Sequence, residues 1–370
     1  MVTGQCKAIF LACIFLFFAC ETDLNDSVND FASGVPELHL AVVDSFGVEI
    51  GDSLNTIGSI NGYFVSSEGA IVLLDGVAKK IRIFQRSGEV SCFGRVGGGP
   101  GEMSSPKSIC LMPDGRILVP DDQKCIVMEY DISGNYLGNY LESGWKIPED
   151  FFPIDSNSVV GVVFEPVYGE GEIEGFNFYI GRFDADPEPA VRYIEVYRDL
   201  HDPSLYTHID ILDYCIDSNG LAYIVPDHTD YLINVLNSDG VLLQQICPEI
   251  TRLEKTDEEI AIELAVFEED HLWDRGYSGG YEPLQYYKLI SLVGIDKDRN
   301  LWVQRMDAEN GFIFDVWDLS GSLIHTVALD EFTSNPDIEF YVDANGILGV
   351  IADSDVYPRV YRLEMIEQIN

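Results

Sequence analysis

Short hydrophobic runs, separated by turn-forming residues, recur along most of the chain. The segments 70–74 and 81–84 are rich in Val, Ile, Leu and Phe, which is typical of β-strands. Arg82 and Arg86 alternate with other residues of this stretch, and the alternation predicts that both side chains lie on exposed strand faces. The pattern therefore predicts an all-β protein built from short antiparallel strands.

The turns between these runs repeat at a regular spacing. Gly69 and Gly115 are 46 residues apart, and so are Asn300 and Gly346. A second glycine turn follows the first within a unit, as Gly88 follows Gly69 after 19 residues. A repeat in the forties fits four antiparallel strands joined by tight turns, which is the blade of a β-propeller. One blade cannot bury both of its faces, so several must stack around an axis to form a core.

Counting these units predicts a six-bladed β-propeller over residues 37–370. The third unit is degenerate, because 155–158 replaces its first turn and 168–175 adds a loop. The segment 38–50 could complete the last blade, which would close the ring with strands from both chain ends. The predicted blades span residues 60–106, 107–150, 151–203, 209–250, 288–332 and 337–368.

One segment, 256–275, lacks the alternation of a strand. Thr256 followed by Glu259 forms a capping box, and Ile260 and Leu264 lie on one helical face. The sequence therefore predicts a short helical insertion between the fourth and fifth blades. The helix could simply pack on the propeller, or it could cover the central tunnel as a lid.

The charge balance excludes some classes of function. The chain has 370 residues, with 22 Lys and Arg against 63 Asp and Glu, and a formal net charge of −41. Nucleic-acid binding needs Lys and Arg to neutralise phosphates, so no nucleic-acid partner is expected. The same excess of acids argues against binding to an anionic lipid surface through a basic face. Because 46% of the residues are hydrophobic, the acidity does not indicate disorder.

The N-terminus indicates export. Residues 1–19 carry one charge, Lys7, before an apolar run that is too short to span a bilayer, so they are predicted to be a signal peptide. The sequence 16–20, ending at Cys20, resembles the lipobox of bacterial lipoproteins, although an ordinary cleaved signal is the alternative. The resemblance implies acylation of Cys20. The polar segment 20–36 is predicted to be a flexible tether.

These features predict an exported protein that is anchored by lipid in the bacterial cell envelope. The resemblance favours the outer membrane if the host has one. Membrane contact is expected through the lipid anchor only, and the folded part is expected to be a monomer.

The segment 94–122 closely resembles the repeat of NHL-type propellers. It has a Gly-rich connector, an apolar strand, Asp114-Gly115 and a second strand that ends in Asp121, with Met103 where that family usually has Phe. Weaker matches follow at 209–245 and 288–324. The resemblance, together with Cys20, points to the six-bladed propeller lipoproteins of bacteria. It implies the fold but says little about chemistry.

Five cysteines remain if Cys20 is acylated and the signal is removed. The simplest interpretation is that most are small apolar core residues. Cys110 and Cys125 could form a disulfide in an oxidising periplasm, although spacing alone does not fix a pairing. The five are Cys92, Cys110, Cys125, Cys215 and Cys247.

An acidic residue recurs after the second strand of every unit. By blade symmetry these acids would form a ring near the tunnel mouth, where they could hold a hard cation such as calcium or bind a cationic ligand. The alternative is that each carboxylate binds its own backbone and fixes the adjacent turn. No cofactor is required by either hypothesis. The candidate residues are Asp75, Asp121, Glu165, Asp227, Asp307 and Asp353.

The sequence shows no set of catalytic residues. It has neither H-E-x-x-H nor G-x-S-x-G, and His228 beside Asp227 is the only histidine expected near the tunnel mouth. We therefore expect a non-enzymatic binding or scaffold module for a protein, peptide or glycan. The alternative is a hydrolase or lyase that uses a tunnel metal and acts on a sugar or lactone. A purely structural envelope component is a third hypothesis.

Overall fold

The computed structural model describes residues 32, 34–48, 51, 53–143, 146–169, 171–199, 213–250, 252–271, 282–305, 312–332, 338–351 and 357–366. Strands dominate these residues, and helix α2 (Asp257–His271) is the only long helix among them. The all-β prediction is therefore confirmed. The predicted signal peptide, Cys20 and nearly all of the tether lie outside the described residues.

Four sheets have four strands each, in the order of the sequence. The first contains β2 (Ile60–Val65), β3 (Ile71–Asp75), β4 (Lys80–Phe84) and β5 (Val90–Phe93). The second contains β6 (Cys110–Leu111), β7 (Ile117–Asp121), β8 (Ile126–Tyr130) and β9 (Tyr136–Glu142). The third contains β10 (Glu149–Pro153), β11 (Val159–Gly169), β12 (Glu172–Phe183) and β13 (Val191–Asp199). The fourth contains β14 (Asp213–Ile216), β15 (Ala222–Val225), β16 (Ile233–Leu236) and β17 (Leu242–Ile246).

The remaining eight strands form one closed sheet. Its first half contains β18 (Ile290–Ile295), β19 (Leu301–Arg305), β20 (Phe312–Trp317) and β21 (Leu323–Leu329). Its second half contains β22 (Ile338–Asp343), β23 (Gly346–Ile351), β24 (Arg359–Ile366) and β1 (Glu37–Phe46). Parallel contacts of β18 with β22 and of β1 with β21 join the two halves. Strand β1 pairs antiparallel with β24, so the two ends of the described chain close one sheet, as the sequence predicted.

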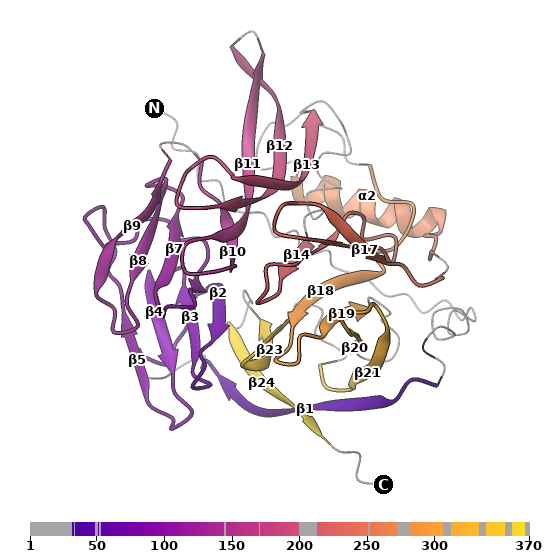
Figure 1. Ribbon diagram of the computed structural model, residues 1–370, viewed down its shortest axis with the longest axis horizontal. Coiled ribbons are helices and arrows are strands. Elements are labelled where there is room, and N and C mark those ends of the chain that lie inside the picture. The colour runs from indigo at the N-terminus through magenta and orange to yellow at the C-terminus, as the bar shows by residue number, and fades with distance from the viewer. Residues whose placement is uncertain are drawn as a thin grey trace.

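The sheets are arranged around a common centre in a propeller-like manner (Figure 1). The first strand of each sheet lies innermost, and β2, β6, β10, β14, β18 and β22 contact one another in that order. Each pair of successive sheets encloses its own hydrophobic core. For example, Val72 packs with Val119 between the first two sheets, and Tyr179 packs with Val127 between the next two. Burial between neighbouring sheets therefore supplies the stabilisation that no single sheet could supply.

A closing core lies between the last and the first sheets. Val350 and Val360 of the closed sheet pack there against Ile71 and Leu73 of β3. The Asn345 side chain also donates to the Val65 carbonyl at 2.7 Å. The ring is therefore continuous from the first sheet to the last.

Three predictions about the units need correction. Glu149 and Asp150 begin β10 of the third sheet, so they do not end the second unit at 150. The segment 168–175 is not an added loop, because β11 and β12 run through it as a long hairpin. Arg82 is buried with its guanidinium 2.8 Å from the Asp75 carboxylate, and so it does not face solvent.

The helical insertion begins where the capping box predicted. The Thr256 amide donates to the Glu259 side chain at 2.8 Å, and the Glu259 amide donates to the Thr256 hydroxyl at 3.3 Å. Helix α2 lies toward the rim of the ring and not at its centre (Figure 1). This position fits a helix packed on the outer part of the propeller better than a central lid. Among the described residues, no helix is both long and apolar enough to cross a membrane.

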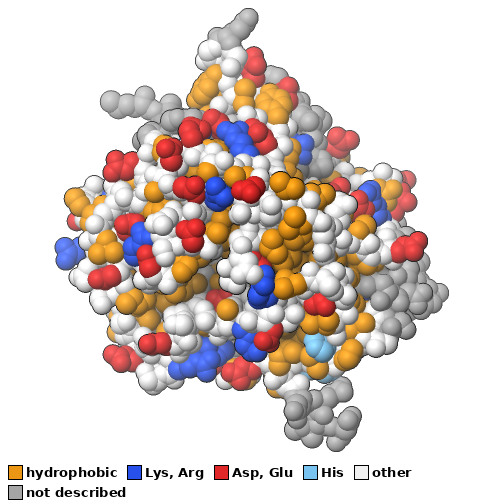
Figure 2. All heavy atoms as spheres, in the orientation of Figure 1, with side chains coloured by type: hydrophobic (Ala, Val, Ile, Leu, Met, Phe, Trp, Pro, Cys, Tyr) orange, Lys and Arg blue, Asp and Glu red, His pale blue; other side chains and the backbone are white. Residues whose placement is uncertain are grey.

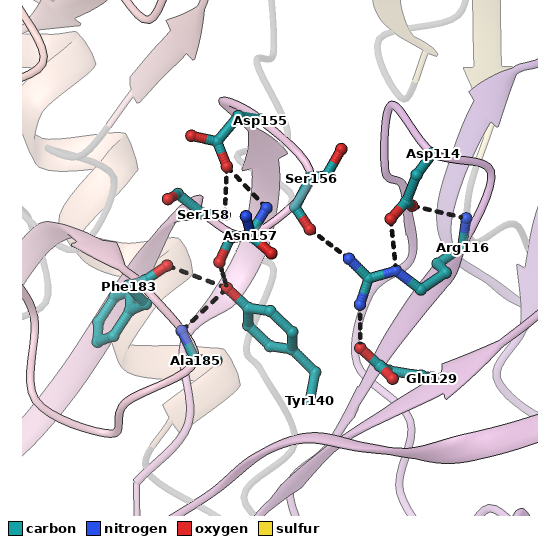
Figure 3. Close-up of polar contacts among 10 residues, drawn as sticks. All are labelled: Asp114, Arg116, Glu129, Tyr140, Asp155, Ser156, Asn157, Ser158, Phe183 and Ala185. Atoms are coloured by element: carbon teal, nitrogen blue, oxygen red, sulfur yellow. Dashed lines mark hydrogen bonds and ion pairs between the residues drawn. The ribbon is translucent and has the colours of Figure 1, made fainter.

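The second and third sheets are joined on one side by a polar contact (Figure 3). The Tyr140 hydroxyl donates to the Asn157 carbonyl at 2.6 Å and accepts from the Ala185 amide at 3.1 Å. The Arg116 guanidinium binds Glu129 and the Ser156 carbonyl. The turn 155–158, which departs from the glycine turns of other units, is therefore held by side chains of the preceding sheet.

Candidate functional site

The first two acids predicted from the sequence bind the protein's own backbone. Asp75 is fully buried, and it accepts from the amides of Gly58 at 3.2 Å and Ala78 at 2.8 Å as well as from Arg82. Asp121 is also fully buried and accepts from the amide of Ser104 at 2.6 Å. These contacts fix the connections at the ends of β3 and β7, which is what the local alternative describes.

The two other predicted acids that the structure describes have partners of their own. Glu165 lies within β11 and forms an ion pair with Lys146 at 3.3 Å. Asp227 is exposed and accepts from the amide and hydroxyl of Thr229, both at 2.8 Å. Asp307 and Asp353 lie outside the described residues.

A different polar set lies on the innermost strands, and all its members except Tyr63 are among the first two residues of their strand. Since consecutive sheets repeat the same up-and-down order, these strand beginnings share one face of the molecule. We call this set the central cluster. It consists of Tyr63 on β2, Glu149 and Asp150 on β10, Asp213 on β14, Ser291 on β18 and Glu339 on β22.

Hydrogen bonds connect neighbouring strands of this face. Asn61 beside Tyr63 donates to the Pro106 carbonyl at 2.9 Å, and the Asp150 amide donates to the Ser108 hydroxyl at 3.2 Å. The Ser291 hydroxyl donates to the Asp213 carboxylate at 2.8 Å. The central cluster is therefore built on strands that are held in register with one another.

Acidic residues of two distant innermost strands influence each other electrostatically in the central cluster. Strands β10 and β22 are separated by two innermost strands in either direction around the ring. Burial raises the pKa of Glu339, and the negative charge of Asp150 raises that pKa further. Both charges also raise the pKa of Tyr63, after the larger effect of burial. Both Asp150 and Glu339 keep solvent-exposed surface, so a ligand in solution can reach these two carboxyl groups.

Glu149 is protonated more easily than an ordinary glutamate. Burial raises its pKa to about 7, Asp150 and Asp122 raise it as well, and Lys107 opposes them. Asp150 itself has a left-handed backbone, with φ of 51°, at an irregularity in β10. Such a bulge turns side chains away from the regular alternation of a strand. In the central cluster, several carboxyl groups lie together, and partial burial makes their charged forms less stable than in water.

We predict that Glu149→Gln flattens the pH dependence of stability. Between its ordinary pKa of 4.5 and the raised pKa of about 7, Glu149 holds a proton in the folded chain that the unfolded chain has lost. The free energy of unfolding therefore falls as pH rises through this window. Urea unfolding at pH 5 and pH 8 should show a smaller difference in the variant, whereas exposed Glu68→Gln should match the parent. An unchanged difference in Glu149→Gln would contradict this assignment.

Asp213, another member of the central cluster, lies close to a histidine. Its carboxylate accepts from the Leu292 amide at 2.6 Å in addition to Ser291. Burial raises the pKa of Asp213, and nearby His228 lowers it. His228 Nδ1 lies 2.9 Å from the Ile290 carbonyl, and because a carbonyl only accepts, Nδ1 must be the donor. The basic nitrogen of the neutral ring is then Nε2, and its orientation is fixed by β18.

The disulfide considered from the sequence is not present. Cys110 and Cys125 are not bonded to each other, and all five described cysteines are free thiols. Cys110 is a buried core residue, and burial raises its pKa to about 12. Within the described residues, no three His, Cys, Asp or Glu side chains lie together in a way that could hold a metal ion.

The sequence carried a signal for the central cluster that the turn pattern obscured. An acid directly precedes an aromatic residue at the beginning of three innermost strands, in Asp150-Phe151, Asp213-Tyr214 and Glu339-Phe340. Phe151, Tyr214 and Phe340 are buried between sheets. This pair marks a strand whose first side chain is polar and whose second belongs to the core.

Comparison with known proteins supports the fold. No protein-family model matches the chain, and no curated protein matches its sequence. A solved structure from Bacteroides fragilis NCTC 9343, described as a candidate exported protein, is 9% identical with a TM-score of 0.50, over 90% of this chain and 99% of that one. Regucalcin, a calcium-binding protein from Agrobacterium tumefaciens, is 11% identical with a TM-score of 0.45, over 88% and 95%. Virginiamycin B lyase from Staphylococcus aureus is 10% identical with a TM-score of 0.43, over 88% and 100%.

Identities this low show a similarity of fold alone. The similarity to the Bacteroides fragilis structure extends over nearly the whole of both chains, and the propeller-like arrangement of sheets described above agrees with the prediction from the repeats. They test neither the resemblance to NHL-type propellers nor the predicted lipid anchor, and both rest on the sequence alone.

Proposed function

We propose that the protein is a binding module that holds a positively charged ligand at the central cluster. The observation that carries this proposal is that exposed acids begin innermost strands far apart in the ring, Asp150 on β10 and Glu339 on β22, and that the charge of Asp150 acts on Glu339. A ligand with ammonium or guanidinium groups would relieve the repulsion between these carboxylates and replace lost solvation with charge-assisted hydrogen bonds.

Two finer features belong to the same proposal. The closed sheet of eight strands is best understood as two blades, β18–β21 and β22–β24 with β1, because a separate hydrophobic core lies on each side of each half. This gives six blades.

The second feature is export with a lipid anchor, which the apolar segment 1–19 and Cys20 support. Mass spectrometry of the mature N-terminus tests this part of the proposal. A mature chain that still contains residues 1–19 would contradict it.

Calcium fits the central cluster less well than an organic cation. Calcium takes about six to eight oxygen ligands, several of them carboxylates on one centre. The described residues bring no three acidic or His side chains into such a group. We therefore base the proposal on a cation that spans the cluster and not on a metal ion.

The experiment is a calorimetric titration of the full-length chain with 1,5-diaminopentane, a linear diamine with a cation at each end. Binding should weaken as sodium chloride is raised, because the attraction is between charges. The matched neutral probe, 1,5-pentanediol, should not bind. If neither compound binds, or if both bind equally well, the proposal is wrong.

A metal-independent hydrolase or lyase is the second candidate function. The observation in its favour is His228, which is held by β18 beside the buried carboxyl group of Asp213 and the Ser291 hydroxyl. A positioned imidazole next to a carboxylate can accept and return a proton. Turnover of a lactone such as dihydrocoumarin that His228→Asn abolishes and Asp227→Asn leaves unchanged would favour this function.

A further inference from the structure

The third sheet differs from its neighbours in the length of its middle strands. Strands β11 and β12 have 11 and 12 residues, whereas β7 and β8 have five each and β15 and β16 have four each. Their outer parts project beyond the rest of the molecule (Figure 1). We call this projection the tongue, and it comprises residues 163–169, 171–179 and 195–199.

The tongue rises from the face that carries the central cluster. Glu149 of that cluster pairs with Val162 of β11, and β11 continues from Val162 away from β10 to Gly169. A ligand that extends outward from Glu149 and Asp150 would therefore meet the tongue.

Apolar side chains are exposed on the tongue, which is unusual for such an acidic protein. Tyr168 is 66% exposed, Tyr197 48%, Phe164 43% and Ile173 39%. Phe164 and Phe178 pack edge to face, with ring centroids 5.0 Å apart, so one face of the hairpin presents a row of aromatic rings. Figure 2 shows hydrophobic side chains on the projection at the top of the molecule. Exposed apolar side chains that cluster on a projection mark an interaction surface.

Acidic residues flank these apolar side chains. The tongue carries five acids, Glu165, Glu172, Glu174, Glu195 and Asp199, against one base, Arg198. Glu165 and Glu195 form ion pairs with Lys146 and Arg192 at the base of the tongue, so the excess of acid lies toward its outer end, at Glu172 and Glu174. Its charge therefore favours a cationic partner and disfavours both an anionic lipid surface and a second copy of a chain with net charge −41. A partner with both lysine or arginine and large apolar side chains would match the acids and the aromatic rings together.

We infer that the tongue docks a cationic polypeptide segment with aromatic or aliphatic side chains, which continues into the central cluster. This inference deepens the proposed function, because it names the ligand class as a polypeptide, and it rests on that proposal for the part at the ring centre. The tongue supplies apolar contact area, and its acids orient the chain. The aromatic rings are presented by paired strands, so little ordering is needed on binding.

The test uses the full-length chain and a synthetic nine-residue peptide that alternates lysine with tryptophan and valine. Affinity is measured by fluorescence anisotropy, with one control peptide that has glutamine for lysine and a second that has alanine for tryptophan. Both controls should bind at least ten-fold more weakly. The variant Tyr168→Ser/Ile173→Ser should weaken binding of the first peptide at least ten-fold. The matched variant Leu137→Ser/Val241→Ser removes two equally exposed side chains elsewhere and should leave binding unchanged.

Two sets of variants separate this inference from the proposed function. If Asp150→Asn/Glu339→Gln weakens binding and the tongue variant does not, the tongue inference is wrong while the central site stands. If the tongue variant alone weakens binding, the proposed central site is wrong. Concentration-dependent dimerisation, or binding to phosphatidylglycerol vesicles, that the tongue variant abolishes would also overturn the inference.

Discussion

Replacing Asp75 by alanine should lower the free energy of unfolding by about 3–5 kcal/mol, because it leaves the Arg82 charge buried without its partner. The two side chains are 0% and 4% exposed, and two Arg82 nitrogens donate to one Asp75 oxygen at 2.8 and 3.0 Å. The substitution also leaves the amides of Gly58 and Ala78 without their acceptor. Urea unfolding followed by fluorescence measures the change.

Two comparisons identify the uncompensated charge as the cause. The double variant Asp75→Ala/Arg82→Met removes the charge as well and should recover part of the lost stability, even if the single variant fails to fold. Asp298→Asn breaks an exposed ion pair with Lys297 and should leave the free energy of unfolding almost unchanged. If Asp75→Ala and Asp298→Asn lowered stability equally, the Asp75–Arg82 pair would have no special role in the fold.

The double variant Asp150→Asn/Glu339→Gln should weaken binding of 1,5-diaminopentane about 100-fold. A hydrogen bond to a charged group contributes roughly 1.5 kcal/mol or more, and about 1.4 kcal/mol is a factor of ten in affinity. Both substitutions keep the size and the polar atoms of the side chains while removing the two charges. Calorimetry under one set of salt and pH conditions measures the effect.

A control of equal charge distinguishes the site from the general acidity of the protein. Glu68→Gln/Glu89→Gln also removes two negative charges, but both side chains are exposed away from the central cluster. This control should bind the diamine as the parent does. Equal losses in the two double variants would show that net charge, and not the central cluster, attracts the ligand.

In the parent, affinity for the diamine should also rise as pH increases through 7, because Glu149 then becomes charged.

The repeat pattern predicted the blade architecture because turn residues report local backbone geometry. Gly69, Gly115, Gly134 and Gly240 all have φ between 77° and 89°, a conformation that favours glycine, and each ends a tight turn between strands. Spacing of such turns can be read without any knowledge of tertiary contacts.

Packing between sheets could not be predicted in the same way. Alternation indicated an exposed Arg82, but Asp75 lies seven residues earlier and compensates its charge in the interior. Asp150 resembled the end of a unit because polar residues usually mark loops, yet it begins an innermost strand. The electrostatic effect of Asp150 on Glu339 connects positions 189 residues apart, which share the ring centre only because the sheets close into a ring. The candidate site thus depended on long-range contacts that no local pattern contains.

The most direct test of the central claim is a crystal structure of the full-length chain grown with 1,5-diaminopentane. The account predicts electron density for the diamine between β10 and β22, with its two nitrogens at charge-assisted hydrogen-bond distances of about 2.7–2.9 Å from the carboxylates of Asp150 and Glu339. Density for the diamine elsewhere, or carboxylates of Asp150 and Glu339 that point away from each other with no ligand between them, would contradict it.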